Sequence, residues 1–398
     1  MSNRAGNHVL CGTGVTAYKC FVPKTMPPDG GISFDEDMIY LLSEAGRQLG
    51  RLDEITDSLI SPNYFVYMYA RKEAAWSSQI EGTRATFADL IRKEAGFEDG
   101  PDDVQEIENC IRAIRYGFER LQELPLSLRL IREIHAILMQ DVRGQHKDPG
   151  EFRRSQNWIG GASIEAAYYV PPSVEHMRPL LDDLEKFIYA EDRLHPVVKA
   201  ALIHAQFEMI HPFLDGNGRT GRLLITFYFA HEGMLHKPTL YLSGFFLKNR
   251  SAYYARLADI QERGDYESWI RFFLQGMVDS CSEAVQLARR VQALKEADST
   301  TLRAMSRSAQ QALTLHEALF DKPTITIDEA ATLLGVAYTT AGRVIDRMVE
   351  LGILALLGER KRGRVFIYEK YAPSTCRVSG GFSSCCGKPM SCSLLRPK

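Results

Sequence analysis

Apolar residues recur at helical spacing along most of the chain. Between residues 39 and 52 they lie three or four positions apart, and Ser33 with Glu36 predicts a capping box just before this run. The same spacing appears in YFVYMYARKEAAWSSQIEG, VQEIENCIRAIRYGFERLQ, LSLRLIREIHAILM, VEHMRPLLDDLEKFIY, PVVKAALIHAQFEMI, LLITFYFAHEG and ESWIRFFLQGMVDSCSEAVQLARRVQALKEA. We therefore expect a mainly α-helical fold.

The segment 144–172 interrupts the helical pattern. Several glycines and a proline pair surround two short runs, NWIG and YYVPP. Glycine and proline favour turns, and short apolar or aromatic runs between them favour strands. We expect this segment to form an irregular loop that contains a small β-hairpin.

The pattern changes again toward the C-terminus. Residues 293–310, around DSTTLRAMSR, are polar and lack periodicity, which predicts a linker. Residues 311–372 contain two predicted helices separated by a turn at Gly335 and Val336, and then two short apolar runs around the basic turn ERKRGR. Helix, turn, helix and basic hairpin in this order predict a winged-helix domain. Residues 373–398 are expected to be a disordered tail.

Composition limits the classes of partner. The 398 residues are 45% hydrophobic and 25% charged with a net charge of −2, so no overall charge attracts nucleic acid or membrane. No run of about 18 apolar residues predicts a membrane span. The start MSNRAGNHVLCGTG lacks the apolar run of a signal peptide, so we expect a cytoplasmic protein. The eight cysteines are scattered or crowded near the end without CxxC pairs, which predicts reduced thiols and no zinc site.

The stretch HPFLDGNGRTGRLL, residues 211–224, carries the candidate chemistry. Pro212 disfavours helical dihedral angles at His211, so the preceding helix is expected to end there with the imidazole at a corner. Gly216 and Gly218 remove side chains where the backbone can approach a ligand closely. A helix that begins directly afterwards points free N–H groups and its positive dipole end into this turn, which predicts a phosphate site.

Polar side chains complete the candidate site. Arg219 and Arg222 are three residues apart on one helix face and can clamp further phosphate oxygens. Asp215 offers a hard oxygen ligand that suits Mg²⁺ shared with the phosphates, and the Asn217 amide can donate to a phosphate oxygen. An imidazole with an ordinary pKa of about 6.5 is largely neutral at pH 7, so His211 is a candidate general base. A glycine-rich helix cap without a ligand is the alternative, but the full set of residues at this spacing favours the site.

The stretch HPFLDGNGRTGR resembles the Fic-family signature HPFxDGNGRxxR at every specified position. Members of that family transfer AMP from ATP to a hydroxyl side chain of a target protein, so the resemblance implies a helical Fic fold with a β-hairpin flap. It also implies that His211 is the general base and that Asp215 binds Mg²⁺. The loop residues implied to bind ATP are Asp215, Gly216, Asn217, Gly218, Arg219, Thr220, Gly221 and Arg222.

Two flanking segments resemble further parts of the family. The segment RRSQNWIGG stands where members have a flap whose backbone holds the target by strand pairing, and NRSAYYARLADIQERGD resembles the adenine-side segment. A plain hairpin strand and core aromatic residues remain the alternatives. The implied flap residues are Asn157, Trp158, Ile159 and Gly160, and the implied base-pocket residues are Tyr253, Tyr254 and Gln261. The implied domains are an N-terminal helical region at 1–110 and a Fic core at 111–292.

The stretch SSQIEGT contains a candidate switch. Ser77 and Glu81 are four residues apart and share one helix face, and Gly82 can stop the helix. An ordinary helix end on the surface is the plain interpretation. The stretch also resembles the inhibitory motif S/T-x-x-x-E-G/N of Fic proteins, which implies that Glu81 pairs with Arg222 and keeps it from the γ-phosphate of ATP. The same glutamate could position water for removal of AMP, and the residues leave this open.

The predicted winged helix suggests a second partner. Small polar and basic residues at the start of its recognition helix and in its basic turn suit DNA, whereas the near-neutral chain suits protein docking or a homodimer. Both interpretations remain open. The residues concerned are Thr339, Thr340 and Arg343 in the helix, and Arg360, Lys361, Arg362 and Arg364 in the turn.

The resemblance implies a protein adenylyltransferase that uses ATP and Mg²⁺ to modify Ser, Thr or Tyr hydroxyls, its own included. One alternative is a DNA-binding regulator whose Fic domain only senses nucleotide. Another is a Fic enzyme that uses a different donor, such as UTP or phosphocholine, or that removes AMP. The variant His211→Ala separates the first alternative from the enzyme, because a sensor keeps its biological effect and a transferase loses it.

Overall fold

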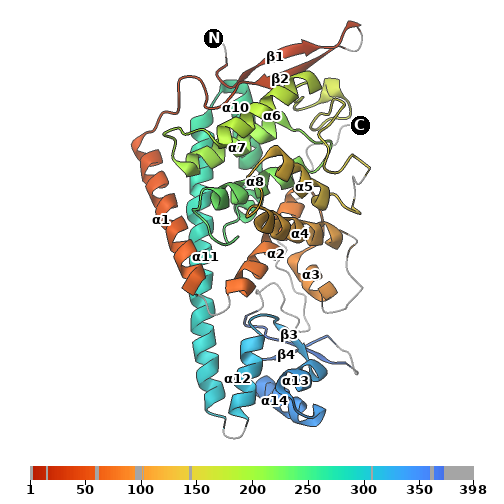
Figure 1. Ribbon diagram of the computed structural model, residues 1–398, viewed down its shortest axis with the longest axis vertical. Helices are drawn as coiled ribbons and strands as arrows, with labels where there is room; N and C mark the ends of the chain where they lie inside the picture. Colours follow the sequence, from red (N-terminus) through yellow and green to blue (C-terminus); the bar gives the residue numbers. More distant parts are fainter. Residues whose placement is uncertain are drawn as a thin grey trace, which may run out of the picture. The chain divides into compact units, whose positions relative to one another are not determined.

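The fold is mainly helical, as expected, and the described residues also form two small antiparallel sheets (Figure 1). The computed structural model describes residues 3–14, 17–58, 62–94, 101, 103–142, 146–305, 308–358 and 363–371. The chain forms two compact units, Met1–Gln292 and Ala293–Lys398. Within the described ranges, no helix combines the length and the apolar content that a bilayer span requires.

The elements of the first unit begin with a hairpin and continue as helices. They are β1 (Gly6–Cys11), β2 (Tyr18–Pro23), α1 (Glu36–Ser58), α2 (Pro62–Ile80), α3 (Phe87–Glu94), α4 (Val104–Arg120), α5 (Leu128–Leu138), η2 (Ile164–Ala166), α6 (Val174–Ile188), α7 (Pro196–Ile210), α8 (Asn217–His231), α9 (Ser243–Lys248) and α10 (Arg250–Arg263). The long helix α11 (Tyr266–Arg303) belongs to both units.

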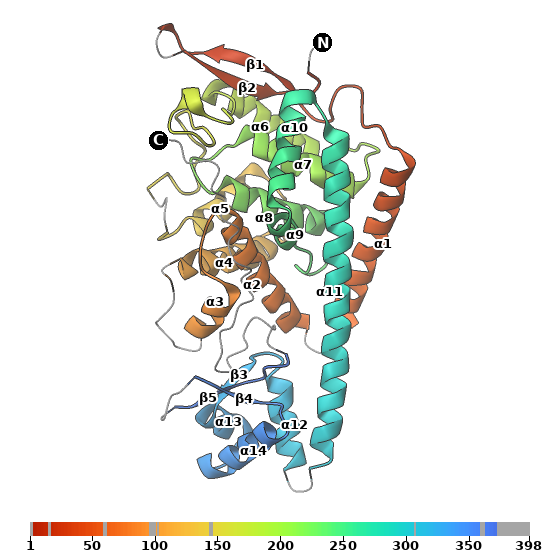
Figure 2. The ribbon, with the colours of Figure 1, turned by 180° about the vertical axis from the view of Figure 1, so that it is seen from behind.

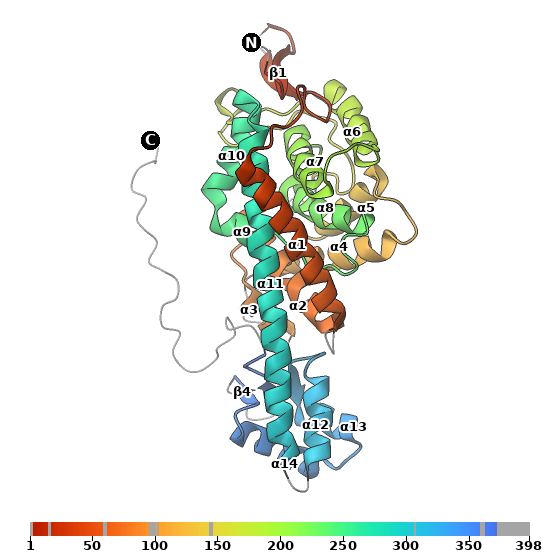
Figure 3. The ribbon, with the colours of Figure 1, turned by 90° about the vertical axis from the view of Figure 1, so that its left-hand side faces the viewer.

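Helices α7 and α8 form the centre of the first unit. Thirteen of the fifteen residues of α7 are buried, because its apolar residues lie on every face. Figure 3 shows α7 and α8 between α9–α11 on one side and α4–α6 on the other. A side chain at Gly221 would overlap the Phe207 ring and the Glu208 carboxylate, so this glycine lets α7 and α8 pack closely. The loop that joins these two helices is the candidate site.

Helices α9, α10 and α11 lie side by side (Figure 2), and aromatic side chains pack between them. The Phe246 ring stacks on the Tyr253 ring with 4.5 Å between centroids, and the Trp269 indole donates a 2.9 Å hydrogen bond to the Ala201 carbonyl of α7. This packing fixes α7, and with it the start of the candidate loop.

Three local expectations differ from the structure. The N-terminal residues form the β1–β2 hairpin, with Gly6 paired to Pro23 and Cys11 to Tyr18, which the pattern did not predict. Asp35, rather than Ser33, caps α1, because its carboxylate accepts the Met38 N–H at 2.9 Å. The hairpin expected within 144–172 is reduced to one bridge between Ile159 and Tyr169, since turns occupy most of that segment.

The second unit contains α12 (Ala309–Ala318), β3 (Thr324–Thr326), α13 (Ile327–Leu334), α14 (Tyr338–Glu350), β4 (Ala355–Leu357) and β5 (Val365–Ile367). The strands form an antiparallel sheet in the order β3-β5-β4. The two helices predicted on either side of Gly335 and Val336 are α13 and α14, and the assignment as a winged helix stays a prediction. Thr339, Arg343 and Arg364 are exposed and Thr340 is half-buried. The predicted basic residues Arg360, Lys361 and Arg362, and the tail at 373–398, lie outside the described residues.

The linker expected at 293–310 is largely helical instead. Helix α11 continues to Arg303, and Leu302 is fully buried. The buried Asp298 carboxylate accepts the Tyr368 hydroxyl at 2.7 Å. The stretch looked patternless because few apolar residues mark its buried face, while a polar contact of this kind holds it in place.

Candidate active site

The loop between α7 and α8 begins at His211. Helix α7 ends at Ile210, as Pro212 predicted, and His211 adopts a left-handed conformation with φ 49° and ψ 61°. That conformation is uncommon for a residue with a side chain and costs about 1–2 kcal/mol. The buried Arg153 stabilises it, because its Nε donates to the His211 carbonyl at 3.0 Å and its backbone N–H donates to the Pro212 carbonyl at 2.9 Å.

Asn217 holds the loop closed at its other end. Its Oδ1 accepts the Phe213 N–H, and its Nδ2 donates to the Phe213 carbonyl, both at 2.8 Å. Both polar groups of this buried side chain are therefore occupied, so the amide that we expected to meet phosphate shapes the loop in this structure. The backbone N–H of Asn217 still lies in the first turn of α8, which no side chain caps within the described part of the chain.

His135 supports the same turn from α5. Its Nε2 donates to the Asp215 carbonyl at 2.9 Å, and its Nδ1 accepts the Gly150 N–H at 2.9 Å. The ring also stacks on Phe213, with centroids 3.7 Å apart. Burial lowers the pKa of His135 to about 4, which keeps the ring neutral with both nitrogens in use. Nothing in the sequence pattern distinguished this histidine from other helix residues.

Gly216 and Gly218 leave space for different neighbours. Gly216 has φ 74°, and a Cβ atom there would lie 2.7 Å from the Met139 sulfur. A Cβ atom on Gly218 would overlap Oε1 of Glu81 and lie 2.9 Å from Nη1 of Arg222. The Glu81 carboxylate therefore sits against the first turn of α8, where a helix favours a negative charge.

The predicted contact between Glu81 and Arg222 is present. Nη2 of Arg222 donates to Oε1 of Glu81 at 2.7 Å and to the Ser77 carbonyl at 3.0 Å, and Nε donates to the Ser77 hydroxyl at 3.0 Å. Gly82, with φ 95°, follows the end of α2 and turns the chain away. Burial opposes ionisation of Glu81, but the charge of Arg222 outweighs it, so the pKa of Glu81 is lowered and the pair is ionised.

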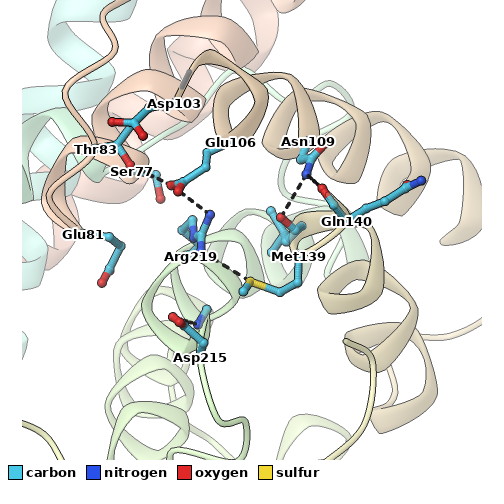
Figure 4. A network of polar contacts seen from close by, with 12 residues as sticks. Ser77, Glu81, Thr83, Asp103, Glu106, Asn109, Met139, Gln140, Asp215 and Arg219 are labelled. Atoms are coloured by element: carbon cyan, nitrogen blue, oxygen red, sulfur yellow. Dashed lines mark hydrogen bonds and ion pairs between the residues drawn. The ribbon is translucent and has the colours of Figure 1, made fainter. Parts of the chain in front are cut away.

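Arg219 is held separately from Arg222. Its Nη1 donates to Oε2 of Glu106 at 3.3 Å, and its Nη2 lies 3.4 Å from the Met139 sulfur (Figure 4). The same Glu106 oxygen accepts the Thr83 hydroxyl at 2.7 Å. Both arginines predicted to bind phosphate are thus engaged by carboxylates of the N-terminal helical region.

His211 and Asp215 have electrostatic environments that suit a base and a cation ligand. Burial, and then the charge of Arg153, lower the pKa of His211 to about 4, so the imidazole is neutral at pH 7. Its Nδ1 is buried without a hydrogen-bond partner among the described residues. Burial opposes ionisation of Asp215, but the ion pair with Lys147 at 2.9 Å outweighs it and lowers the pKa of Asp215. The carboxylate therefore already holds one cation, the Lys147 ammonium.

The other predicted loop residues have supporting contacts. The Thr220 hydroxyl donates to the Gly216 carbonyl at 2.9 Å. The Gly221 carbonyl accepts from Nδ1 of His204 at 2.9 Å, and Nε2 of His204 accepts the Tyr253 hydroxyl at 2.9 Å. The side chains of Thr220 and His204 therefore hold the backbone of α8 in place, and their polar groups are used within the protein.

The predicted flap and base-pocket residues are partly exposed. Trp158 and Ile159 are 43% and 39% exposed, and the Asn157 amide donates to the Phe213 carbonyl at 2.8 Å, which ties the flap segment to the loop. Gly160, with φ 71°, leaves room for the Tyr168 ring. In α10, one predicted base-pocket residue packs in the core and two are accessible. Tyr253 is buried in the aromatic core, whereas Tyr254 is 44% exposed and Gln261, two turns further on, is half-buried on the same face.

Fold and site together define a mainly helical protein in which a neutral histidine lies beside a helix start that no described side chain caps. Residues 125–229 match the Fic/DOC family, and residues 39–119 match the N-terminal region of that family. These two matches place most of the described helical core, from α1 to α8, in regions similar to the Fic/DOC family.

Two relatives and one solved structure illustrate the similarity. The protein adenylyltransferase Fic of Drosophila mojavensis is 34% identical over 253 residues, which cover 59% of this chain and 46% of the relative. The protein of the same name from Drosophila melanogaster is 32% identical over 253 residues, covering 59% and 47%. This chain thus spans slightly less than half the length of these curated relatives. A crystal structure of a Fic family protein from Desulfovibrio desulfuricans G20 shares the fold, with a TM-score of 0.56, 19% identity, and 85% of this chain and 97% of that chain covered.

Proposed function

We propose that this protein is an adenylyltransferase that moves AMP from ATP to a protein hydroxyl and that Glu81 restrains it. The observation that carries the proposal is the neutral His211 beside the uncapped first turn of α8. The names of the relatives, which are protein adenylyltransferases, support the reaction class. The substrate hydroxyl would be that of a Ser, Thr or Tyr side chain, on a target or on the chain itself.

The chemistry follows from where the charges lie. The unprotonated nitrogen of His211 accepts the proton of the incoming hydroxyl, whose oxygen forms a bond to the α-phosphorus as the bond to the bridging oxygen breaks. Diphosphate leaves with its negative charge near the backbone N–H groups of Asn217 and Gly218. Preorganised donors of this kind usually supply the largest part of the rate acceleration. Arg222 would bind a further phosphate oxygen once Glu81 is displaced, and Arg219 would bind another with the donors that Glu106 leaves unused.

The cation that accompanies ATP would be Mg²⁺ at Asp215. Among the described residues, no group of three or more His, Cys, Asp or Glu side chains could hold a metal ion by itself. A single carboxylate fits Mg²⁺, which is usually held by one or two carboxylates, substrate phosphates and waters. The ion would offset the charge of the phosphates, and Asp215 would exchange Lys147 for it.

Glu81 explains how the site is restrained. Its carboxylate takes the place at Gly218 and Arg222 that the γ-phosphate needs, so ATP would bind in a pose that does not react. A ligand that competes with this contact, or a partner that moves the turn after α2, would release the enzyme.

Incubation with labelled ATP tests the proposal. We expect a 5′-adenylyl adduct on the Glu81→Gly protein by mass spectrometry, little on wild type, and none on the double variant Glu81→Gly/His211→Ala. Parallel incubations with UTP and with a phosphocholine donor identify the donor. If the Glu81→Gly protein forms no adduct with any donor, alone or with a cell extract as source of targets, the proposed reaction is wrong.

The second unit would supply a separate contact. Thr339 and Arg343 are exposed on α14, which suits either the phosphates of duplex DNA or a polar protein surface. A gel-shift titration with random-sequence duplex, repeated with Arg343→Glu, separates the two: salt-sensitive binding that the variant loses supports DNA. Sedimentation of the free protein at several concentrations shows whether a second copy is the partner.

A further inference from the structure

The turn after α2 contacts α8 directly through Glu81 and contacts α4 through Thr83. Glu81 bonds directly to Arg222, and two residues later the Thr83 hydroxyl bonds to Oε2 of Glu106 at 2.7 Å. The N–H groups of Glu81 and Thr83 both donate to the Ser78 carbonyl, at 3.0 Å and 3.2 Å. These bonds tie the backbones of the two residues together, so a movement of the whole turn that removes Glu81 from Arg222 also pulls Thr83 from Glu106.

Glu106 connects this turn to Arg219. It lies on α4, its side chain is 7% exposed, and the oxygen that accepts the Thr83 hydroxyl also accepts Nη1 of Arg219. Figure 4 shows Glu106 between Thr83 and Arg219, with Met139 on the other side of the guanidinium. A buried carboxylate needs its hydrogen-bond partners, so the number of donors it receives decides how strongly it holds the arginine.

Arg219 is only partly satisfied in this arrangement. Its single carboxylate contact is 3.3 Å long, its second contact is to a thioether sulfur, which is a weak acceptor, and its Nε is buried without a partner among the described residues. A guanidinium with unused buried donors can bind an anion without first breaking strong hydrogen bonds. The geometry therefore holds Arg219 near the loop but leaves it able to bind phosphate.

We propose that Glu106 is a positioning residue for Arg219. We also propose that the hydrogen bond between Thr83 and Glu106 is a second inhibitory contact, called the second hold below, which breaks when Glu81 leaves Arg222. In the restrained state the Thr83 hydroxyl anchors the turn to Glu106. When the turn leaves, Glu106 keeps only Arg219, and the guanidinium is aligned for nucleotide. This inference rests on the proposed function, because it assumes that Glu81 competes with ATP phosphate.

The variant Thr83→Val tests the second hold in the full-length protein. Valine has nearly the same shape and lacks the hydroxyl, so the turn keeps its packing and loses one bond to a charged group, which changes an equilibrium about tenfold. We expect about tenfold faster self-adenylylation in the wild-type background and less than about twofold change in the Glu81→Gly background, where the turn carries no carboxylate that competes with phosphate. Thr56→Val is the matched control, because Thr56 is a buried threonine of α1 whose hydroxyl bonds to the Leu52 carbonyl of its own helix and to no other described residue.

Nucleotide affinity gives a second readout that does not depend on the reaction. We expect calorimetry to show about tenfold tighter binding of MgATP to Thr83→Val than to Thr56→Val, since the competent fraction of the protein rises. In the Glu81→Gly background, Glu106→Gln should raise KM for ATP about tenfold and lower kcat much less, because Arg219 loses its alignment while His211 is untouched. If Glu106 had only a structural role, Glu106→Gln would instead lower the amount of active protein and leave KM for ATP unchanged.

The outcomes are distinguishable. Equal rates and equal ATP affinity for Thr83→Val and Thr56→Val overturn the second hold, as does a tenfold gain that persists in the Glu81→Gly background. If no variant transfers AMP but Thr83→Val still binds ATP more tightly, the coupling stands and the proposed reaction fails. An unchanged KM for Glu106→Gln overturns its positioning role.

Discussion

A single methyl group on Gly218 is expected to release the restraint without touching Glu81 itself. The Cβ atom of Gly218→Ala would overlap Oε1 of Glu81 and lie 2.9 Å from Nη1 of Arg222. The backbone of α8 is buried and fixed by its packing on α7, so the flexible end of Glu81 must move. Arg222 stays anchored, because it also donates to the hydroxyl and carbonyl oxygens of Ser77.

The size of the effect follows from the contact that is lost. Glu81 and Arg222 share one charge-assisted bond of 2.7 Å, and the Glu81 side chain is 33% exposed while that of Arg222 is 2% exposed. A bond to a charged group contributes about 1.5–3 kcal/mol when buried, and partial exposure reduces this to about 1–2 kcal/mol. That range corresponds to a population shift of about five- to thirtyfold.

The assay is the initial rate of self-adenylylation with saturating MgATP for four proteins: wild type, Gly218→Ala, Glu81→Gly and the double variant. We expect Gly218→Ala to react about five- to thirtyfold faster than wild type. Gly50→Ala is the control, because Gly50 is an exposed helical glycine of α1 with no atom near its Cβ position. Gly50→Ala removes a helix-weakening glycine from the interior of α1, which stabilises the protein by about 1 kcal/mol, and it should leave the rate unchanged.

The double variant isolates any direct effect of the methyl group on ATP. If Gly218→Ala slows the Glu81→Gly protein, that factor corrects the single-variant rate. A corrected rate equal to that of wild type would refute the reasoning, because Glu81 would then have kept its inhibitory position beside an added methyl group.

Three further results are expected. Because burial lowers the pKa of His211 to about 4, the rate of Glu81→Gly should stay level from about pH 8 down to about pH 5, and a fall centred near the ordinary value of about 6.5 would contradict this. Lys147→Ala should lower the Mg²⁺ concentration for half-maximal rate about two- to fivefold, since the exposed ammonium no longer competes for Asp215; an unchanged Mg²⁺ titration would contradict it. Burial lowers the pKa of His204 to about 3, so the unfolded chain binds a proton there below about pH 6.5 and the folded chain does not. The stability that neutral His204 contributes is thus lost as pH falls. We expect His204→Gln to have a lower free energy of unfolding in urea than wild type, and this difference should shrink by about 2 kcal/mol from about pH 6.5 to about pH 5.

Local rules predicted the loop well because each acts within a few residues. Proline after His211 ends α7, and the glycines that follow admit the turn into α8. The contact between Glu81 and Arg222 spans 141 positions, and no spacing rule reaches that far. It was predicted from the resemblance of two short motifs to Fic proteins, and the geometry of the contact is confirmed.

The supporting residues could not be predicted from the pattern. Glu106, His135 and Arg153 occur in helical or loop segments where such side chains usually face solvent. Each is buried instead, and each forms its decisive contact with a residue more than fifty positions away. Only the fold brings these side chains to the loop. The same reason explains why residues 293–310 were predicted to be a linker although they are largely helical. The buried Asp298 bonds to Tyr368, which lies 70 positions further along the chain.

The most direct measurement is a crystal structure of the Glu81→Gly protein with Mg²⁺ and a non-hydrolysable ATP analogue. We expect the γ-phosphate within hydrogen-bond distance of the Arg222 guanidinium, in the place that Glu81 leaves, and the α-phosphorus on the side of the loop that the His211 ring faces. An analogue bound elsewhere, or bound here with the imidazole turned away from the α-phosphorus, would contradict both the proposed reaction and the restraint.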